Sequence, residues 1–154
     1  MPEPNGLLTS TDAGLYCEAG DFFVDPNTPV DRAVVTHAHG DHARRGSGAY
    51  LTSAEGESVL RHRMNEGAVI DTLPYGEEIE LNGVRLSFHP AGHVRGSAQV
   101  RLEYDGEVWV VTGDFKVTPD PTCTPFELVP CDVLITECTF GLPIYRWPDP
   151  DAVF

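Results

Sequence analysis

The segment Val34–Gly46, VVTHAHGDHARRG, places three histidines and one aspartate within six residues, directly after an apolar run. These side chains are His37, His39, Asp41 and His42, in the pattern H-x-H-x-D-H. Neutral imidazole and carboxylate are preferred ligands of zinc, and they also bind manganese. The pattern therefore indicates a metal centre that takes several ligands from one turn of the chain.

The spacing divides these four side chains into two pairs. Residues two apart at the end of a strand point to the same side, so His37 and His39 can bind one ion. Gly40 lets the backbone bend, and the turn displaces Asp41 and His42 towards a second ion. The alternative is a solvated turn with surface histidines, and the density of ligand types in this pattern favours the metal centre.

Two later segments add ligands of the same kinds. HPAGHVRGSAQV places His93 in a glycine-rich turn before a strand, and WVVTGDF places Asp114 directly after an apolar strand. Sites are often built on loops at strand ends, and an aspartate there can bridge two metal ions. Alone, each residue has an ordinary interpretation as a loop histidine or a turn aspartate. Together with the first cluster they complete a ligand set.

The elements that must position these side chains are short strands separated by turns. GLYCEAGDFFVD predicts a hairpin with strands over Leu15–Glu18 and Asp21–Val24. RAVVT, Arg32–Thr36, predicts a buried strand that leads directly into the histidine cluster. AYLT, residues 49–52, predicts a further strand.

A helix and a second group of strands follow. The helix is predicted over Thr52–Met64, with capping-box spacing at its start and with Val59 on the same apolar face as Leu60 and Met64. Asn-Gly at 82–83 and Asp-Gly at 105–106 predict two hairpins between alternating runs. DVLITEC, Asp132–Cys138, predicts a last buried strand.

Composition narrows the class of protein. The 154 residues suit one domain, and no apolar stretch approaches the ~20 residues of a membrane span. The segment MPEPNGLL lacks the basic and apolar regions of a secretory signal, so we expect the cytoplasm. The net charge of −14 opposes non-specific binding to nucleic acid but leaves room for a local basic track. An acidic, lysine-poor surface is also typical of proteins adapted to high salt.

The cysteines give no sign of a metal site or a disulfide scaffold of their own. Cys17, Cys123, Cys131 and Cys138 form no C-x-x-C pair. We interpret them as reduced and mostly buried, because free cysteine behaves as a small apolar residue.

The motifs together resemble those of the metallo-β-lactamase fold, and ITECTFGLPIYRW resembles the acidic motif of the β-CASP nucleases. Within that group, the chain is similar from end to end to the bacterial ligase-associated DNA exonucleases. The resemblance implies an α+β fold, the N-terminal portion of an αββα sandwich. Residues 1–154 would form the N-terminal part of the catalytic domain, and the β-CASP cap and C-terminal return strands would be absent.

The resemblance also implies a role for each matching position. It implies three ligands of a first ion, two of a second and one that bridges both: His37, His39 and His93; Asp41 and His42; and Asp114. The implied cofactors are two divalent metal ions, zinc first and manganese as the alternative. Four residues are implied in catalysis: Asp41, which would orient a water molecule, Asp114, Glu137 of the acidic motif, and the supporting Asp25. Two further family histidines have no match, because His62 is interpreted as an exposed helix residue and His89 as a strand-end residue.

The implied function is a metal-dependent phosphodiesterase, a DNA exonuclease of DNA repair that hydrolyses the nucleic-acid backbone with a water molecule activated by two metals. The implied partners are nucleic acid, DNA before RNA, and a DNA ligase and a helicase of the same pathway, with no membrane. One alternative is an RNA-processing β-CASP ribonuclease, and another is a hydrolase of the same fold that acts on a thioester or lactam. A third is an inactive metal-binding truncation, because the two unmatched histidines lie beyond residue 154 in the family pattern.

Overall fold

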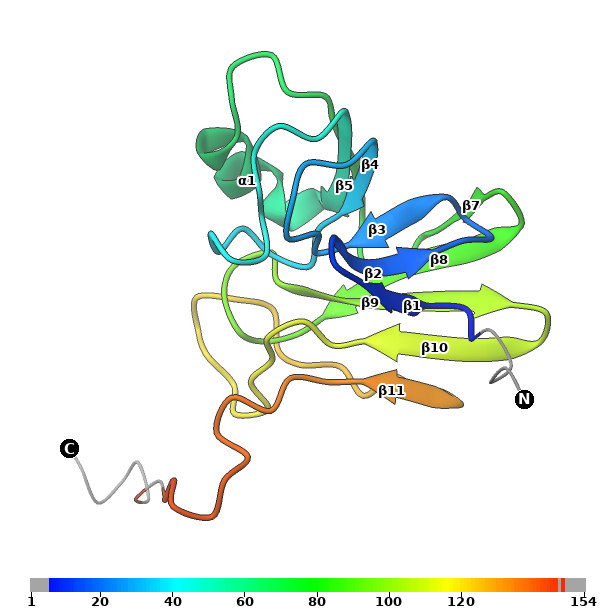
Figure 1. The fold of residues 1–154 in the computed structure, drawn as a ribbon. Helices are drawn as coiled ribbons and strands as arrows, with labels where there is room; N and C mark the ends of the chain where they lie inside the picture. The colour runs from blue at the N-terminus through cyan, green and yellow to red at the C-terminus, as the bar shows by residue number, and fades with distance from the viewer. Residues whose placement is uncertain (1–5, 147, 149–154) are drawn as a thin grey trace.

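Two β-sheets, with one helical layer, make up this computed structural model, which describes residues 6–146 and 148 (Figure 1). Sheet A has the strand order β1-β2-β3-β4-β5-β6. Its strands are β1 (Thr9–Thr11), β2 (Gly14–Cys17), β3 (Phe22–Val24), β4 (Arg32–Val34), β5 (Ala49–Ser53) and β6 (Ile70–Leu73). The β1–β2 and β2–β3 pairs are antiparallel, whereas β3 to β6 run parallel. The carboxyl ends of β3, β4 and β5 therefore meet at one edge.

Sheet B has the strand order β11-β10-β9-β8-β7. Its strands are β7 (Glu78–Leu81), β8 (Val84–Pro90), β9 (Ala98–Tyr104), β10 (Glu107–Val111) and β11 (Val133–Ile135). The first four form an antiparallel meander, and β11 runs parallel to β10. Both predicted hairpin turns are confirmed, because the Asn82-Gly83 and Asp105-Gly106 pairs have positive φ at both residues, as a tight hairpin turn requires.

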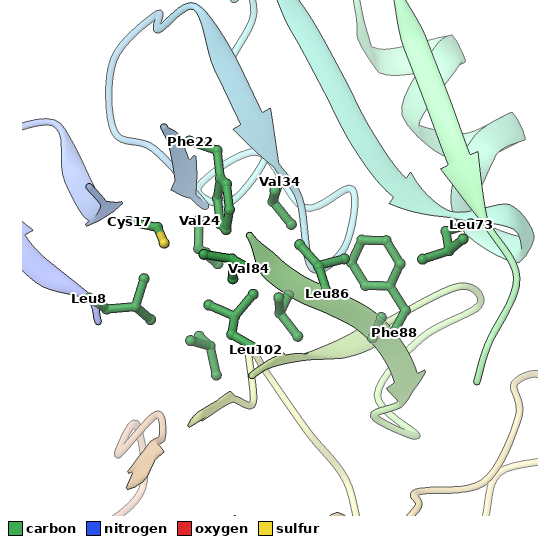
Figure 2. Packing of buried hydrophobic residues seen from close by; sticks show 13 residues of the cluster. Leu8, Cys17, Phe22, Val24, Val34, Leu73, Val84, Leu86, Phe88 and Leu102 are labelled. Carbon is green, nitrogen blue, oxygen red and sulfur yellow. The ribbon is translucent and has the colours of Figure 1, made fainter. Parts of the chain in front are cut away.

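The main core lies between the sheets. Phe22 of β3, Phe88 of β8 and Leu102 of β9 are buried in it and point towards one another's sheets (Figure 2). A second apolar cluster lies on the outer face of sheet A, where Leu60 and Met64 pack. The fold is thus an α+β sandwich, as predicted, and the described residues place a helical layer on sheet A alone.

The helix differs from its prediction at both ends. The chain forms a 3₁₀ turn, η1 (Ala54–Gly56), and then α1 (Glu57–Arg63), so the predicted start at Thr52 is wrong. Thr52 remains in β5 because it pairs with β6. Ser53 caps the turn instead, since its hydroxyl accepts the Gly56 N–H at 3.1 Å. Val59 is 43% exposed and does not share the buried face of Leu60.

The last strand and the cysteines also require correction. The strand predicted over Asp132–Cys138 is only the three residues of β11, and it is not buried, since Leu134 is 55% exposed. β11 is an edge strand whose only partner among the described residues is β10. All four cysteines are free, as predicted, but only Cys17 is buried, and Cys138 is exposed.

Strand ends and further elements differ in smaller ways. β4 stops at Val34, two residues before its predicted end, because the Thr36 backbone bonds to a side chain rather than continuing a ladder. The short strands β1 and β6 were not predicted. Among the described residues, no helix combines the length and the apolar character that crossing a membrane requires.

Candidate metal centre

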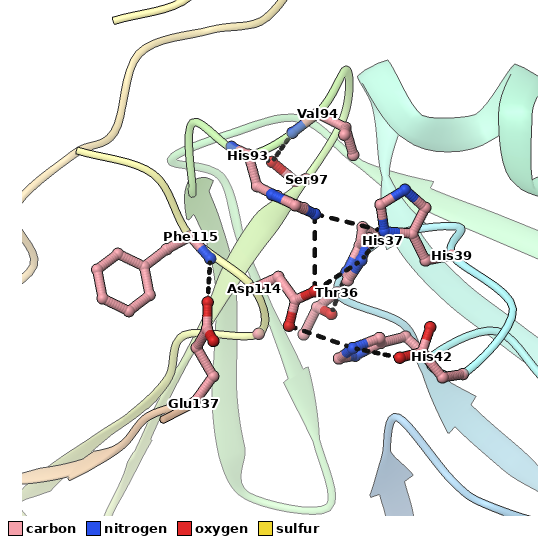
Figure 3. A network of polar contacts seen from close by, with 12 residues as sticks. Thr36, His37, His39, His42, His93, Val94, Ser97, Asp114, Phe115 and Glu137 are labelled. Carbon is pink, nitrogen blue, oxygen red and sulfur yellow. Dashed lines mark hydrogen bonds and ion pairs between the residues drawn. The ribbon is translucent and has the colours of Figure 1, made fainter. Parts of the chain in front are cut away.

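The predicted ligands come from three loops at one edge of the two sheets. His37 and His39 follow β4, His93 lies between β8 and β9, and Asp114 follows β10. β8 and β10 run in the same direction because each is antiparallel to β9, so their ends bring His93 and Asp114 to the same edge. Figure 3 shows these side chains pointing towards one another.

The first group of ligand atoms is compact. His37, His39, His93 and Asp114 each offer one atom, and these atoms lie within 4.8 Å of one another. Nδ1 of His39 lies 2.9 Å from Nε2 of His37 and 3.3 Å from Nε2 of His93. Oδ2 of Asp114 lies 3.7 Å from Nε2 of His37 and 3.6 Å from Nε2 of His93. Three nitrogens and one carboxylate oxygen at this spacing fit a zinc ion.

The charge state of the histidines agrees with that role. Burial and the neighbouring imidazoles of His42, His39 and His93 lower the pKa of His37 to about 2. Burial also lowers the pKa of His93, against the attraction of Asp114. Neutral rings keep nitrogen lone pairs free, which is the form that binds a cation.

A second group shares Asp114 with the first. Its Oδ1 lies 3.3 Å from Nε2 of His42, while its Oδ2 faces the histidines of the first group. Oδ2 of Asp41 lies 3.7 Å from the same His42 nitrogen, and the Asp41 side chain is 76% exposed. The two oxygens of one carboxylate therefore face two separate sets of ligands, which is the geometry of a bridge.

Asp25 contacts two residues of the first ligand loop, Thr36 and His42. Its carboxylate accepts the Thr36 N–H at 2.8 Å and the Thr36 hydroxyl at 2.6 Å, and its Oδ2 lies 2.7 Å from Nδ1 of His42. Burial lowers the pKa of His42, but the hydrogen bond and charge of Asp25, together with the charges of Asp114 and Asp41, outweigh burial and raise it. A proton on Nδ1 leaves Nε2 of His42 facing Asp114.

Three supporting residues escaped the sequence analysis. The Thr36 hydroxyl lies 3.1 Å from Nδ1 of His37 and so connects that ring to Asp25. The Ser97 hydroxyl accepts the His93 N–H at 3.1 Å, and the Tyr75 hydroxyl donates to the Ser97 carbonyl at 2.9 Å. Thr36 directly before the first histidine was the one available signal, whereas the other two contacts depend on tertiary packing.

Glu137 lies near the ligands but outside their group. Its carboxylate accepts the Phe115 N–H at 3.5 Å and the Thr139 N–H at 3.2 Å. The Thr139 hydrogen bond lowers the pKa of Glu137. Glu137 and Asp41 line one groove of about 360 Å³ beside the second ligand group. The structure therefore places Glu137 next to Asp114 through the backbone of Phe115, without direct contact with a predicted ligand in the described part of the chain.

The two remaining histidines lie where the sequence predicts. His62 is exposed on α1. His89 lies at the end of β8, with its ring nitrogens 3.1 Å from the Ser87 hydroxyl and 3.0 Å from a carboxylate oxygen of Glu127. Neither belongs to the ligand group.

Comparisons with known proteins identify the family of this chain. The family model described as "Metallo-beta-lactamase superfamily" matches residues 11–146. A probable DNA ligase of Opitutus terrae is 35% identical over 138 residues, which cover 88% of this chain and 13% of that protein. An RNase J-like protein of Methanocaldococcus jannaschii is 30% identical over 159 residues, which cover 86% of this chain and 37% of that protein. The chain thus spans well under half the length of these relatives.

A solved structure shows similarity of fold alone. It is a protein of unknown function from Enterococcus faecalis V583, with a TM-score of 0.50 and 17% sequence identity. The similar region covers 56% of this chain and 25% of that chain.

Proposed function

Because this chain belongs to the metallo-beta-lactamase superfamily, a family of metal-dependent hydrolases, we propose that it forms the metal-binding part of a phosphodiesterase acting on nucleic acid. The observation that carries the proposal is that the two carboxylate oxygens of Asp114 face two different ligand groups. When bound, two divalent cations make water more acidic and stabilise charge on the attacking and leaving oxygens of a phosphodiester.

The residues present fit two such ions. His37, His39 and His93 would hold the first together with Oδ2 of Asp114, and Asp41 and His42 would hold the second together with Oδ1. We propose zinc, since neutral imidazole dominates the first group, and manganese as the alternative, since carboxylates are two of the three ligands in the second.

The side chains around the ions would divide the remaining work. Asp41 lines the groove and is exposed, so its carboxylate can orient a water molecule by accepting a hydrogen bond. Asp25 orients His42, and Glu137 holds the backbone that follows Asp114. Asp25 and Glu137 are thus proposed as positioning residues, and Asp41 and Asp114 as the catalytic ones.

We propose DNA as the substrate and an exonuclease as the enzyme, working with a ligase and a helicase in DNA repair. The relative from Opitutus terrae supports DNA, because it is described as a DNA ligase and matches most of this chain. RNA is the second candidate, supported by the RNase J-like relative. The free cysteines agree with a reducing compartment, and we propose the cytoplasm.

The proposal is tested with the full-length protein and end-labelled linear DNA, a circular DNA and an RNA of the same sequence. We expect metal-dependent release of nucleotides from linear DNA, no cleavage of the circle, and no activity with a chelator. Asp114→Asn should reduce the rate on the order of 10²-fold or more while keeping the fold. Undiminished cleavage by that variant, or hydrolysis of a thioester or lactam without cleavage of nucleic acid, would contradict the proposal.

A further inference from the structure

The basic side chains of this acidic chain differ in whether they form ion pairs. The chain has 10 lysines and arginines against 24 acidic residues, so carboxylate partners are plentiful. Five of the basic side chains form ion pairs: Arg32, Arg61, Arg85, Arg101 and Lys116. Within residues 6–146, four other arginines form no ion pair and flank the loops of the metal centre: Arg44, Arg45, Arg63 and Arg95. Arg146 forms no ion pair with another residue of the described part of the chain.

One of these arginines lies over the first ligand loop, and a second is bonded to its backbone. Nη1 of Arg63 lies 3.2 Å from the point that a Cβ on Gly40 would occupy, and Gly40 separates two predicted ligands. Nε of Arg45 donates to the Arg63 carbonyl at 2.6 Å. The loop after the histidines and the end of α1 are therefore joined, and they lie side by side in Figure 1. Tyr50 anchors the same loop, since its hydroxyl donates to the Arg44 carbonyl at 2.8 Å.

The fourth arginine approaches from sheet B. Arg95 is exposed, two residues after the predicted ligand His93. Its loop is fixed against the start of the helical layer, because the Ser53 hydroxyl donates to the Gly96 carbonyl at 2.6 Å. Exposed arginines thus come from three segments that carry or adjoin the first ligand group, whereas the groove beside the second group carries carboxylates such as Asp41 and Glu137.

This placement is unfavourable unless an anion is present. Arginines beside a site for two divalent cations repel those cations. The chain has a net charge of −14, so carboxylate partners for these arginines exist at other places on its surface. Guanidinium groups bind phosphate oxygens in bidentate fashion and remain charged at any working pH. A polymer of phosphates that reaches the metal centre satisfies both the arginines and the cations.

We propose that Arg44, Arg45, Arg63 and Arg95 form an arginine track that binds the phosphate backbone of nucleic acid on its way to the metal centre. The track rests on the proposed function, and it deepens it by naming the side from which the strand arrives. The nucleic-acid strand would cross the His39–Asp41 loop on the side of the first ion. The carboxylate-lined groove beside the second ligand group would then remain free for the reacting end of that strand.

The test measures binding without hydrolysis. Fluorescence anisotropy of a labelled single-stranded DNA, and of an RNA of the same sequence, is followed with the full-length protein in a chelator over a range of salt concentrations. Binding weakens as salt rises, and each phosphate contact with a single strand makes the slope of log K against log salt about 0.7 more negative. Replacing all four arginines of the track by glutamine should make the slope less negative by about 3, and replacing all four by lysine should largely preserve it.

The matched control is Arg32→Gln. Arg32 is exposed and lies at the opposite end of β4 from the histidines, so its loss should leave the slope unchanged. If the fourfold variant folds poorly, four single glutamine variants carry the test, and each should make the slope less negative by about 0.7.

The outcomes separate the track from the proposed function. A slope that is the same in the track variants and the wild type would overturn the track, whether or not the protein cleaves nucleic acid. A less negative slope of the track variants with DNA, RNA or both supports the track and identifies which backbone it prefers. Because the binding assay contains no metal, a wild-type protein that fails to cleave would contradict only the proposed function.

Discussion

At the scale of single residues, the two kinds of histidine in this chain differ in what surrounds them. His37 is buried among other imidazoles and faces Asp114, whereas His62 is exposed on α1. Removing His37 or His93 takes away one of three neutral nitrogens in the first ligand group, while removing His62 takes away none.

We therefore expect His37→Ala and His93→Ala each to lose most of the tightly bound metal, and His62→Ala to keep it. Elemental analysis of the three purified variants, at equal protein concentration, measures this. An equal loss of metal from the His62 variant would show that the ligand set is wrong.

Asp25 is not a predicted ligand, but it contacts the predicted ligand His42, and replacing it tests whether that contact matters for metal binding. In Asp25→Asn, the amide N–H₂ faces donors in either orientation: the Thr36 N–H at the Oδ1 position, or the Thr36 hydroxyl together with Nδ1 of His42 at the Oδ2 position. Loss of such supporting contacts typically costs about 10–100-fold in metal affinity. We expect that loss for the second ion, measured by calorimetry.

Asp21→Asn is the matched control. Asp21 lies directly before β3 and Asp25 directly after it, and both residues have positive φ. Unchanged affinity in the Asp25 variant would mean that His42 is positioned by its packing alone.

At the scale of elements, the backbone of the 3₁₀ turn η1 and the backbone of the His93 loop lie so close together that they leave no space for a side chain. A Cβ on Gly96 would overlap with the backbone of Gly56 in η1, and Gly96 has φ +75°. Gly76 has almost the same φ, +76°, with nothing within 4 Å of an added Cβ. The two glycines therefore differ mainly in space.

Gly76→Ala should cost about 1–2 kcal/mol of unfolding free energy, the usual penalty of a side chain in the left-handed region. Gly96→Ala should cost more and should also lower metal affinity, because its loop carries His93. Urea unfolding and metal titration of both variants measure the difference. Equal costs would show that the loop can move away from η1 without consequence.

At the scale of the whole molecule, the two ligand groups are unequal. The first has four converging donors, and the second has three, of which Asp41 is largely exposed. Calorimetric titration of the 154-residue chain with zinc should therefore show one tight site and one clearly weaker site. Two equally tight sites would contradict the unequal groups.

Net charge is also a property of the whole molecule. At −14, the folded chain repels itself, and salt screens that repulsion. We expect the Tm in a chelator to rise between 0.05 and 1 M potassium chloride at pH 7. A constant or falling Tm would show that local ion pairs outweigh the overall repulsion.

Features that depend on neighbouring residues were predictable from the sequence. The H-x-H-x-D-H cluster needs only one strand end and one turn, and the Asn82-Gly83 and Asp105-Gly106 hairpins need only positive φ at adjacent residues. The α+β sandwich follows from such local patterns together with the family resemblance, and the metal centre stays a prediction whose ligand types lie close together in the structure.

Features that depend on distant pairing were decided by the tertiary structure. Pairing of β5 with β6 moved the start of the helical segment, and the edge position of β11 left its side chains half exposed. Parallel pairing of β3 with β4 brings Asp25 against Thr36 and His42, and the direction of β10 places Asp114 at the edge where its two oxygens face separate ligand groups. A sequence lists the ligand types, but the distances between them are set by strands that meet only when the chain is folded.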